Sequence, residues 1–258
     1  MIWTMTSVMS RTEISRITKI NVIRHLYQPL SPFYFVERIP LECPSVDSLL
    51  GGGIEKGSVT LIYGEAGAGK TNLCLQLAIN QAREGGKVIY VDTEGLSGER
   101  IEQILGQNDA EALKNLLVFH VHDFTEQMTR IDSAVRLAES NDNIRLIVVD
   151  SMTMYYRLRM RDDESSARES LTKQTEMLLN VARKRNVPVV FTSQVYTKIK
   201  TGSYEALGGH VIHHNAKTII RLDKVQSGLR RAVVMKHRSL PEGKSALFRI
   251  VQEGLASD

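Results

Sequence analysis

An eight-residue glycine-rich motif constrains the fold of this chain more than any other feature. Residues 64–71 read Gly-Glu-Ala-Gly-Ala-Gly-Lys-Thr and match the pattern G-x-x-x-x-G-K-[ST]. Glycines at these positions let the backbone curl until several N–H groups point at phosphate oxygens, and a following helix directs its positive N-terminal end there. The apolar run at 58–63 predicts a strand directly before the motif. A strand, a glycine-rich turn and a helix are the setting that a phosphate-binding loop requires.

The motif also assigns roles to its last residues. Lys70 is placed to reach the β and γ oxygens of a bound ATP, and the hydroxyl of Thr71 is placed to bind Mg²⁺. We therefore expect ATP and Mg²⁺ as cofactors and Lys70 as a catalytic residue. The expected nucleotide-binding residues in and beside the loop are Gly64, Glu65, Ala66, Gly67, Ala68, Gly69, Lys70, Thr71 and Asn72.

Composition places the chain among soluble globular proteins. Hydrophobic residues make up 42% and charged residues 24% of the 258 residues, and no apolar stretch is long enough to cross a bilayer. Residues 1–6 lack the basic-then-apolar order of a secretory signal, and Cys43 and Cys74 are the only cysteines. We therefore expect a cytoplasmic protein with no membrane role. The net charge of +4 is too small to indicate a polyanionic partner by itself.

Apolar runs of strand length alternate with helix-length stretches through most of the chain. This alternation is typical of an α/β protein with a mostly parallel, twisted sheet flanked by helices. The C-terminal part differs, because its strands follow one another without helices, which predicts antiparallel strands added to one sheet edge. Strands are expected at 59–63, 87–92, 117–120, 145–150, 188–193, 217–222, 231–236 and 246–251, and helices from 70 to about 84 and at 98–105, 125–138 and 165–185.

The first part of the chain has no clean hydrophobic periodicity. Residues 1–39 contain further methionines at positions 5 and 9 and the sequence Pro-Leu-Ser-Pro at 29–32. We expect these residues to form a separate, poorly ordered N-terminal arm ahead of an ATPase core at 40–258. A gene start placed too early would produce the same pattern, and the sequence leaves both interpretations open.

A carboxylate follows the expected strand at 145–150. Residues 146–150 read Leu-Ile-Val-Val-Asp, the form of a buried strand that delivers an acid to the magnesium ion beside a phosphate-binding loop. We expect Asp150 and Thr71 to form the metal side of the site. An aspartate that only caps the strand before Ser151 is the alternative interpretation.

Hydrolysis also requires a group that activates water, and residues 88–95, Val-Ile-Tyr-Val-Asp-Thr-Glu-Gly, contain two candidates. Parallel strands in an open sheet deliver their C-terminal ends to one edge, so Glu94 is expected near the phosphates. Glu94 is therefore the expected catalytic carboxylate, and Asp92 could serve instead. Helix capping or a plain surface charge is the alternative for this acidic pair.

Together these motifs resemble the ATPase core of RecA-type recombinases, in their archaeal RadA and RadB branch. The resemblance covers about residues 40–254. It implies a RecA-like P-loop ATPase core with ATP sites at protomer interfaces, acting in DNA repair and recombination. Further segments that carry it are Leu-Leu-Gly-Gly-Gly-Ile-Glu-Lys-Gly at 49–57, Glu-Arg-Ile at 99–101, Thr-Ser-Gln-Val at 192–195, Gly-Gly-His at 208–210 and Leu-Pro-Glu-Gly at 240–243.

The resemblance implies roles for three residues. It implies that Glu94 activates water and that Arg100 stacks on adenine as part of the nucleotide site. It further implies that Gln194 is a catalytic residue that senses the γ-phosphate and couples it to a DNA-binding loop. The stretch between Glu94 and Arg100 is one residue shorter than the usual recombinase pattern.

Two departures from strand-exchange recombinases point to the RadB type. Those enzymes carry an N-terminal helix-hairpin-helix domain and a Phe-x-x-Ala polymerisation element, whereas the nearest string here, Phe-Tyr-Phe-Val at 33–36, ends in a larger residue than the alanine pocket accepts. Their strand exit carries Asp and Pro that cap a neighbour's ATP, and it reads Lys-His-Arg at 236–238 in this chain. This basic triplet resembles RadB, the recombinase paralogue without the N-terminal domain.

Two basic and aromatic loops are expected at the phosphate edge of the sheet, one after Asp150 and a mobile one after Gln194. Basic side chains neutralise backbone phosphates and tyrosines stack on unpaired bases, so single-stranded or branched DNA is the expected partner. Pairing of the first loop with the acids at 162–164 is the alternative, as is edge protection by the triplet at 236–238. The expected DNA-binding residues are Arg157, Arg159, Arg161, Lys198, Lys200, Lys236, His237 and Arg238.

The histidines at 120, 122, 210, 213 and 214 are not expected to bind a metal. No cysteine or second carboxylate has metal-ligand spacing with them. Cys74 lies among leucines on the helix after the loop, where a small buried apolar residue is the expected role.

The sequence therefore predicts a DNA repair and recombination protein with weak Mg²⁺-dependent ATPase activity, accessory to homologous recombination. Weak polymerisation would leave each interface ATP site half built, which is why slow hydrolysis is expected. Recombinase or nuclease proteins are candidate partners, and oligomers would form through the ATP site. Three alternatives stay open: a filament-forming strand-exchange recombinase, a nucleotide-gated mediator, and a KaiC-like signalling ATPase.

Overall fold

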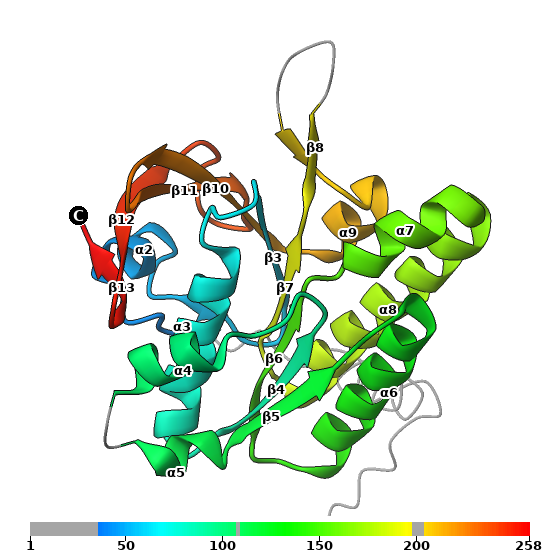
Figure 1. Cartoon of the computed structure of the whole chain (residues 1–258), viewed down its shortest axis with the longest axis horizontal. Helices are drawn as coiled ribbons and strands as arrows, with labels where there is room; N and C mark the ends of the chain where they lie inside the picture. Colours follow the sequence, from blue (N-terminus) through cyan, green and yellow to red (C-terminus); the bar gives the residue numbers. More distant parts are fainter. Residues whose placement is uncertain (1–35, 107–108, 198–203) are drawn as a thin grey trace, which may run out of the picture. The chain divides into compact units, whose positions relative to one another are not determined.

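The structure is a computed structural model that describes residues 36–106, 109–197 and 204–258 (Figure 1). Residues Glu37–Asp258 form one compact unit. Its centre is a nine-stranded sheet with the strand order β13-β12-β11-β10-β3-β7-β6-β4-β5. The strands are β3 (Val59–Gly64), β4 (Lys87–Asp92), β5 (Leu116–His120), β6 (Ile144–Asp150), β7 (Val189–Ser193), β10 (Thr218–Gln226), β11 (Leu229–Lys236), β12 (Ser245–Val251) and β13 (Gly254–Ser257).

The sheet has a parallel part and an antiparallel part. Strands β10, β3, β7, β6, β4 and β5 run parallel to their neighbours, whereas β11, β12 and β13 are joined by antiparallel pairs. This confirms the predicted fold class and refines it in one respect. The first of the C-terminal strands, β10, pairs in parallel with β3, so the antiparallel addition begins at β11.

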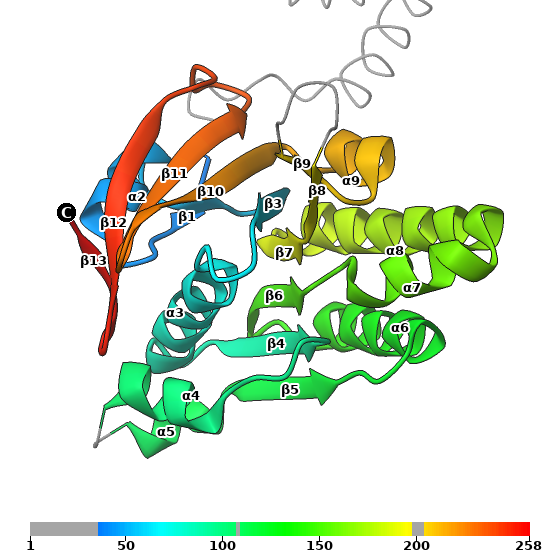
Figure 2. The same cartoon turned by 45° about the horizontal axis from the view of Figure 1, so that its top comes forward.

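Each face of the sheet has its own hydrophobic core, because alternate residues of a buried strand point to opposite faces. In β6, Leu146 and Val148 pack on one side and Ile147 and Val149 on the other. The first face is covered by α2 (Pro44–Leu49), α3 (Lys70–Arg83), α4 (Gly98–Leu105) and α5 (Ala110–Leu113), and the second by α6 (Phe124–Ser140), α7 (Met154–Asp162), α8 (Glu164–Arg185) and α9 (Gly209–Asn215) (Figure 2).

Two small ribbons lie outside the main sheet. Strands β1 (Arg38–Ile39) and β2 (Ile54–Glu55) form one antiparallel pair, and β8 (Val195–Thr197) and β9 (Tyr204–Ala206) form the other. The second ribbon follows β7 directly, which places it at the edge of the sheet where the phosphate-binding loop lies (Figure 1). Within the described ranges no helix is both long and apolar enough to cross a membrane.

The structure corrects the expectation of a loop after Asp150. Residues 154–162 form helix α7, because Met, Leu and Arg are good helix formers and Tyr156 packs in the core. Helices α2, α5 and α9 and the ribbon β8–β9 were also missed by sequence reasoning. These elements are short, so they offer too few residues for a periodic pattern.

Candidate nucleotide-binding site

Residues 64–71 connect β3 to α3, as the motif predicts, and two glycines are required by close approach. Gly69 is the N-cap residue of α3 with φ of 102°, a left-handed conformation that side chains disfavour. A Cβ on Gly64 would lie 2.3 Å from the carbonyl oxygen of Leu222 on β10. The loop is therefore seated against β10 and opens onto the N-terminus of α3, where the helix dipole favours anions.

Lys70 is a buried cation at the first turn of α3. Its side chain is 8% exposed, and its Nζ donates to the carbonyl oxygens of Gly64 and Glu65 at 2.9 and 3.0 Å. Burial lowers the pKa of Lys70, and the charges of Glu94 and Asp150 oppose that shift. The ammonium is thus held over the loop, where the lysine of a phosphate-binding loop contacts the phosphates.

Asp150 lies at the end of β6, 1% exposed, beside the start of α3. Its carboxylate accepts hydrogen bonds from the hydroxyls of Tyr90 and Thr192. Burial raises the pKa of Asp150, against hydrogen bonds from Thr192, Thr71 and Tyr90 that lower it. Asp150 and Thr71 therefore meet, and this oxygen-only donor set fits Mg²⁺, which takes one or two protein oxygens together with phosphates and waters.

Asp92 and Glu94 have different surroundings, which distinguishes the two candidate carboxylates. Asp92 is 3% exposed and accepts backbone N–H groups from Glu94, Gly95 and Leu96 at 3.2, 2.9 and 2.8 Å. Its oxygens are thus occupied in shaping the turn after β4. The carboxylate of Glu94 is exposed at the same edge of the sheet, which makes it the group that can reach water and phosphate.

Gln194 joins Glu94 to the β8–β9 ribbon. Its Nε2 donates to Oε1 of Glu94 at 3.1 Å, and its backbone N–H donates to Thr153 at 3.0 Å. Its Oε1 is buried without a hydrogen-bond partner in the described part of the chain. A buried amide oxygen without a donor is costly, so this side chain is poised for a further contact.

Arg100 on α4 lies beside the helix that follows the loop. Its Nε donates to Oδ1 of Asn72 at 2.6 Å, and its Nη1 donates to the carbonyl oxygen of Gln252 at 2.8 Å. The shorter stretch after Glu94 therefore still brings Arg100 to α3. Arg100 and Asn72 form one side of the site, next to the turn between β12 and β13.

The expected DNA-binding residues have different positions. Arg157, Arg159 and Arg161 are exposed on α7 and, among the described residues, form no ion pair, since Glu164 pairs with Arg168 instead. The helix separates them, because Arg157 and Arg161 share one face and Arg159 points to another. Lys198 and Lys200 lie outside the described residues.

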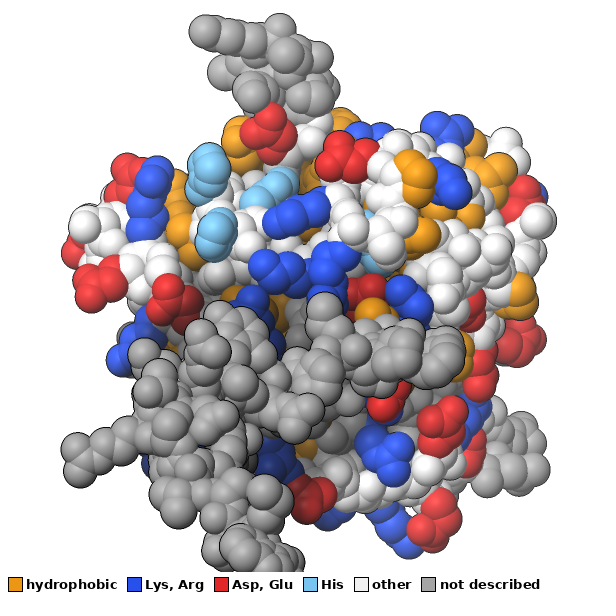
Figure 3. Space-filling view, turned by 180° about the vertical axis from the view of Figure 1, so that it is seen from behind, with side chains coloured by type: hydrophobic (Ala, Val, Ile, Leu, Met, Phe, Trp, Pro, Cys, Tyr) orange, Lys and Arg blue, Asp and Glu red, His pale blue; other side chains and the backbone are white. Residues whose placement is uncertain are grey.

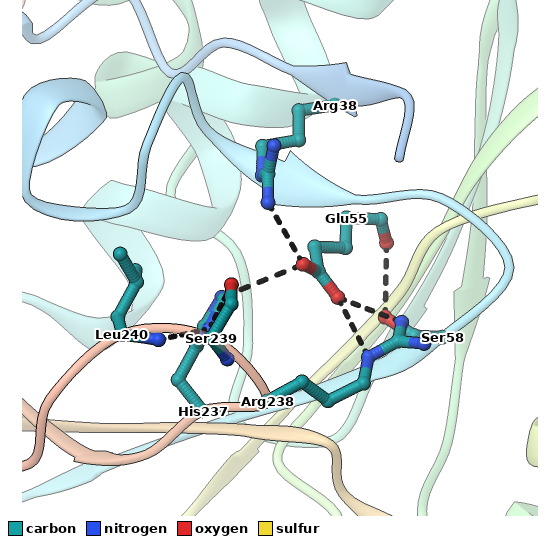
Figure 4. A network of polar contacts seen from close by, with 7 residues as sticks. All are labelled: Arg38, Glu55, Ser58, His237, Arg238, Ser239 and Leu240. Carbon is teal, nitrogen blue, oxygen red and sulfur yellow. Dashed lines mark hydrogen bonds and ion pairs between the residues drawn. The ribbon is translucent and has the colours of Figure 1, made fainter. Parts of the chain in front are cut away.

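The basic triplet at 236–238 makes contacts within the protein, although the side chain of Arg238 is 51% exposed. The Nζ of Lys236 donates to the carbonyl oxygens of His213 and Ala216 at 2.7 and 2.8 Å. Arg238 pairs with the buried Glu55 at 2.7 Å, and Arg38 pairs with the other oxygen of Glu55 at 3.0 Å (Figure 4).

His237 is 1% exposed in the same network. Its Nδ1 accepts backbone N–H groups from Ser239 and Leu240, and its Nε2 lies 3.5 Å from Glu55. Burial lowers the pKa of His237. The triplet therefore holds β11 to the β1–β2 ribbon, and its DNA-binding role stays a prediction.

One contact at the site was not expected from the sequence. Tyr204 at the start of β9 lies near Glu65 in the phosphate-binding loop, and interaction with this carboxylate raises the pKa of Tyr204. The ribbon thus contacts the loop as well as Glu94. A tyrosine after a glycine-containing segment gives no signal for this partner, because the contact joins residues far apart in the sequence.

The remaining candidate groups are the cysteines and the histidines. Both cysteines are free and buried, as expected for Cys74. Across the described ranges, no group of three or more His, Cys, Asp and Glu side chains is arranged to hold a metal ion.

Seen from behind, several histidines gather near a band of Lys and Arg side chains, which marks a basic face (Figure 3).

Comparison with known proteins places this site in a family. The family model for Rad51 matches residues 36–258. RadB of Methanococcoides burtonii, a DNA repair and recombination protein, is 47% identical over 85% of this chain and 97% of the relative. RadB of Archaeoglobus fulgidus is 44% identical over 84% and 97%. A crystal structure of the RadB recombinase superposes with a TM-score of 0.75 at 38% identity, covering 85% of this chain and 99% of that chain. The chain therefore belongs to the Rad51 family, among the RadB proteins.

Proposed function

We propose that this protein is a DNA repair ATPase that binds ATP, Mg²⁺ and DNA, hydrolyses ATP slowly and assists homologous recombination. The observation that carries the proposal is the hydrogen bond between Gln194 and Glu94. It connects the carboxylate facing the nucleotide site to the ribbon β8–β9. The names of the RadB relatives, DNA repair and recombination proteins, support the same role.

Each residue of the site has a proposed part in hydrolysis. Lys70 neutralises the outer phosphates, and the backbone N–H groups of the loop bind their oxygens. Asp150 and Thr71 would hold Mg²⁺, which stabilises negative charge on the phosphates. Glu94 orients the attacking water and accepts its proton, and Gln194 fixes the position of Glu94.

Slow hydrolysis follows from the exposure of the site. Glu94 is exposed, so the described part of its own chain leaves the reacting phosphate open to bulk water. Family ATP sites lie between protomers, and a neighbouring copy would complete the enclosure. We propose that such oligomers form weakly, which leaves turnover low.

DNA would bind along α7 and the ribbon β8–β9. The arginines of α7 are exposed and unpaired among the described residues, and Tyr196 and Tyr204 of the ribbon are 43% and 42% exposed. Exposed cations with nearby aromatic rings are typical of sequence-independent binding to single strands. Recombinase or nuclease proteins remain proposed partners.

The test is ATP hydrolysis with and without single-stranded DNA, together with DNA binding at several salt concentrations, for the wild type and Lys70→Ala. We expect salt-sensitive DNA binding with slow hydrolysis that DNA hardly stimulates and that Lys70→Ala abolishes. Strong stimulation and stable filaments would instead identify a strand-exchange recombinase. Full function in Glu94→Gln would identify a nucleotide-gated mediator, and absence of DNA binding would favour a signalling ATPase.

A further inference from the structure

Two basic side chains of the β10–β11 hairpin lie against the phosphate-binding loop. Lys224 and Arg230 are directly paired across the two strands, so their side chains project from the same face of the hairpin. Nε and Nη2 of Arg230 donate to the carbonyl oxygen of Gly67 at 3.2 and 3.0 Å. Both Cε and Nζ of Lys224 lie 3.3 Å from the position that a Cβ on Gly67 would occupy.

This arrangement of like charges is unfavourable on its own. Cations directly opposite each other on antiparallel strands repel, and the charge of Lys224 also contributes to the lowered pKa of Lys70. In the described part of the chain Lys224 has no ion-pair partner, because the adjacent Asp223 pairs with Arg221. Lys70, Lys224 and Arg230 thus bring three positive charges to one loop, and no carboxylate of the described residues pairs with Lys224. This indicates that the balancing negative charge belongs to a ligand.

The backbone next to Lys224 explains why its side chain points to the phosphate-binding loop. The pairing of β10 with β11 is irregular between Lys224 and Gln226, which is the position of a β-bulge. Bulges turn a strand locally and change the direction of its side chains, and they are common next to binding sites. A bulge here therefore accounts for a lysine that reaches the loop of the neighbouring parallel strand.

We propose that Lys224 contacts the phosphates of the nucleotide bound in its own chain, as a second ammonium beside Lys70. Arg230 is a positioning residue in this arrangement, because its donors are bonded to the loop carbonyl of Gly67. The proposal rests on the proposed binding of ATP, and it adds a phosphate contact that the glycine-rich motif does not contain. Lysine acts as a point charge, so arginine at the same position should largely replace it.

The test is the affinity of the full chain for fluorescent ATP and ADP analogues, measured for the wild type, Lys224→Ala, Lys224→Arg and Lys244→Ala. Lys244 is an exposed lysine between β11 and β12, so its removal changes the net charge equally without touching the loop. We expect Lys224→Ala to weaken ATP binding about tenfold, the size of one charge-assisted hydrogen bond at an exposed group. The affinity of Lys224→Arg for ATP should stay within about threefold of the wild type, and that of Lys244→Ala should equal the wild type.

Thermal unfolding without nucleotide provides a second readout. Lys224→Ala should unfold at the same temperature as wild type or higher, because it removes repulsion with Arg230. Wild-type affinity in Lys224→Ala would overturn the proposal, and so would equal weakening by Lys244→Ala, since a long-range field would then explain the effect. A wild type that binds no nucleotide would refute the proposed ATP binding itself. A wild type that binds ATP no more tightly than Lys224→Ala would refute only the phosphate contact of Lys224.

Discussion

Substitution of Asp92 tests whether this carboxylate stabilises the turn after β4 or takes part in hydrolysis itself. The buried carboxylate accepts three backbone N–H groups, from Glu94, Gly95 and Leu96. Hydrogen bonds to a charged group contribute about 1.5–3 kcal/mol each, but water can replace part of this where the donors are partly accessible. We therefore expect Asp92→Ala to lower the free energy of unfolding by about 3 kcal/mol. For a domain of this size the melting temperature would fall by about 6–12 °C.

Two conservative variants then distinguish the roles of the acids. Asp92→Asn keeps the oxygen that serves Glu94 and Gly95 and loses the one that serves Leu96, so it should cost about 1–2 kcal/mol. Its hydrolysis rate should stay close to wild type. Glu94→Gln changes an exposed side chain, so stability should be unchanged while hydrolysis falls by a factor of about 10² to 10⁴.

The measurements are thermal unfolding and single-turnover hydrolysis with enzyme in excess over ATP. Single turnover isolates the chemical step from product release, which is necessary for a slow enzyme. The reasoning is refuted if Asp92→Asn unfolds at the wild-type temperature but loses hydrolysis, while Glu94→Gln hydrolyses ATP at the wild-type rate. That result would assign proton transfer to Asp92 and leave Glu94 as a surface charge.

Three further predictions follow from the site. Burial raises the pKa of Asp150, so its ionised form is unfavourable at neutral pH, and Asp150→Asn should raise the melting temperature at pH 7 without nucleotide. That gain in melting temperature should vanish below the ordinary aspartate pKa of about 3.9, as checked by calorimetry at several pH values. In the same variant Mg²⁺ should no longer strengthen ATP binding. Arg100→Ala should weaken ATP and ADP binding equally in competition titrations, because Arg100 is bonded to Asn72 on α3 and not to the phosphate-binding loop. The double variant Arg157→Ala and Arg161→Ala should reduce the slope of log affinity against log salt for single-stranded DNA by about 1.4.

The nucleotide site could be predicted from the sequence because its parts are local. The loop at 64–71 has fixed spacing, and β4 and β6 are uninterrupted apolar runs that end in acids. Parallel pairing then brings Asp92 and Asp150 into register across neighbouring strands. A strand pattern and one topological rule were therefore enough to place these residues at one edge.

The long-range contacts around the loop could not be predicted in the same way. The partner of Glu65 is Tyr204, and the partner of Gly67 is Arg230, both more than a hundred residues away in the chain. Neither pair has a spacing rule, because tertiary packing alone decides which hairpin covers the loop. Helix α7 was missed for a related reason, since only its packing through Tyr156 distinguishes nine residues from a loop.

The two ends of the β10–β11 pair have opposite roles. At one end, Lys224 and Arg230 are directed to the phosphate-binding loop. At the other end, Lys236 is bonded to carbonyl oxygens at the C-terminal end of α9, and Arg238 is paired with Glu55. Lys236 is held within its own chain by these bonds, and Arg238 is held by Glu55 although half of its side chain stays exposed. With the role proposed for Lys224, the extra cation for the phosphates would come from the same chain, and nucleotide binding would not require a filament.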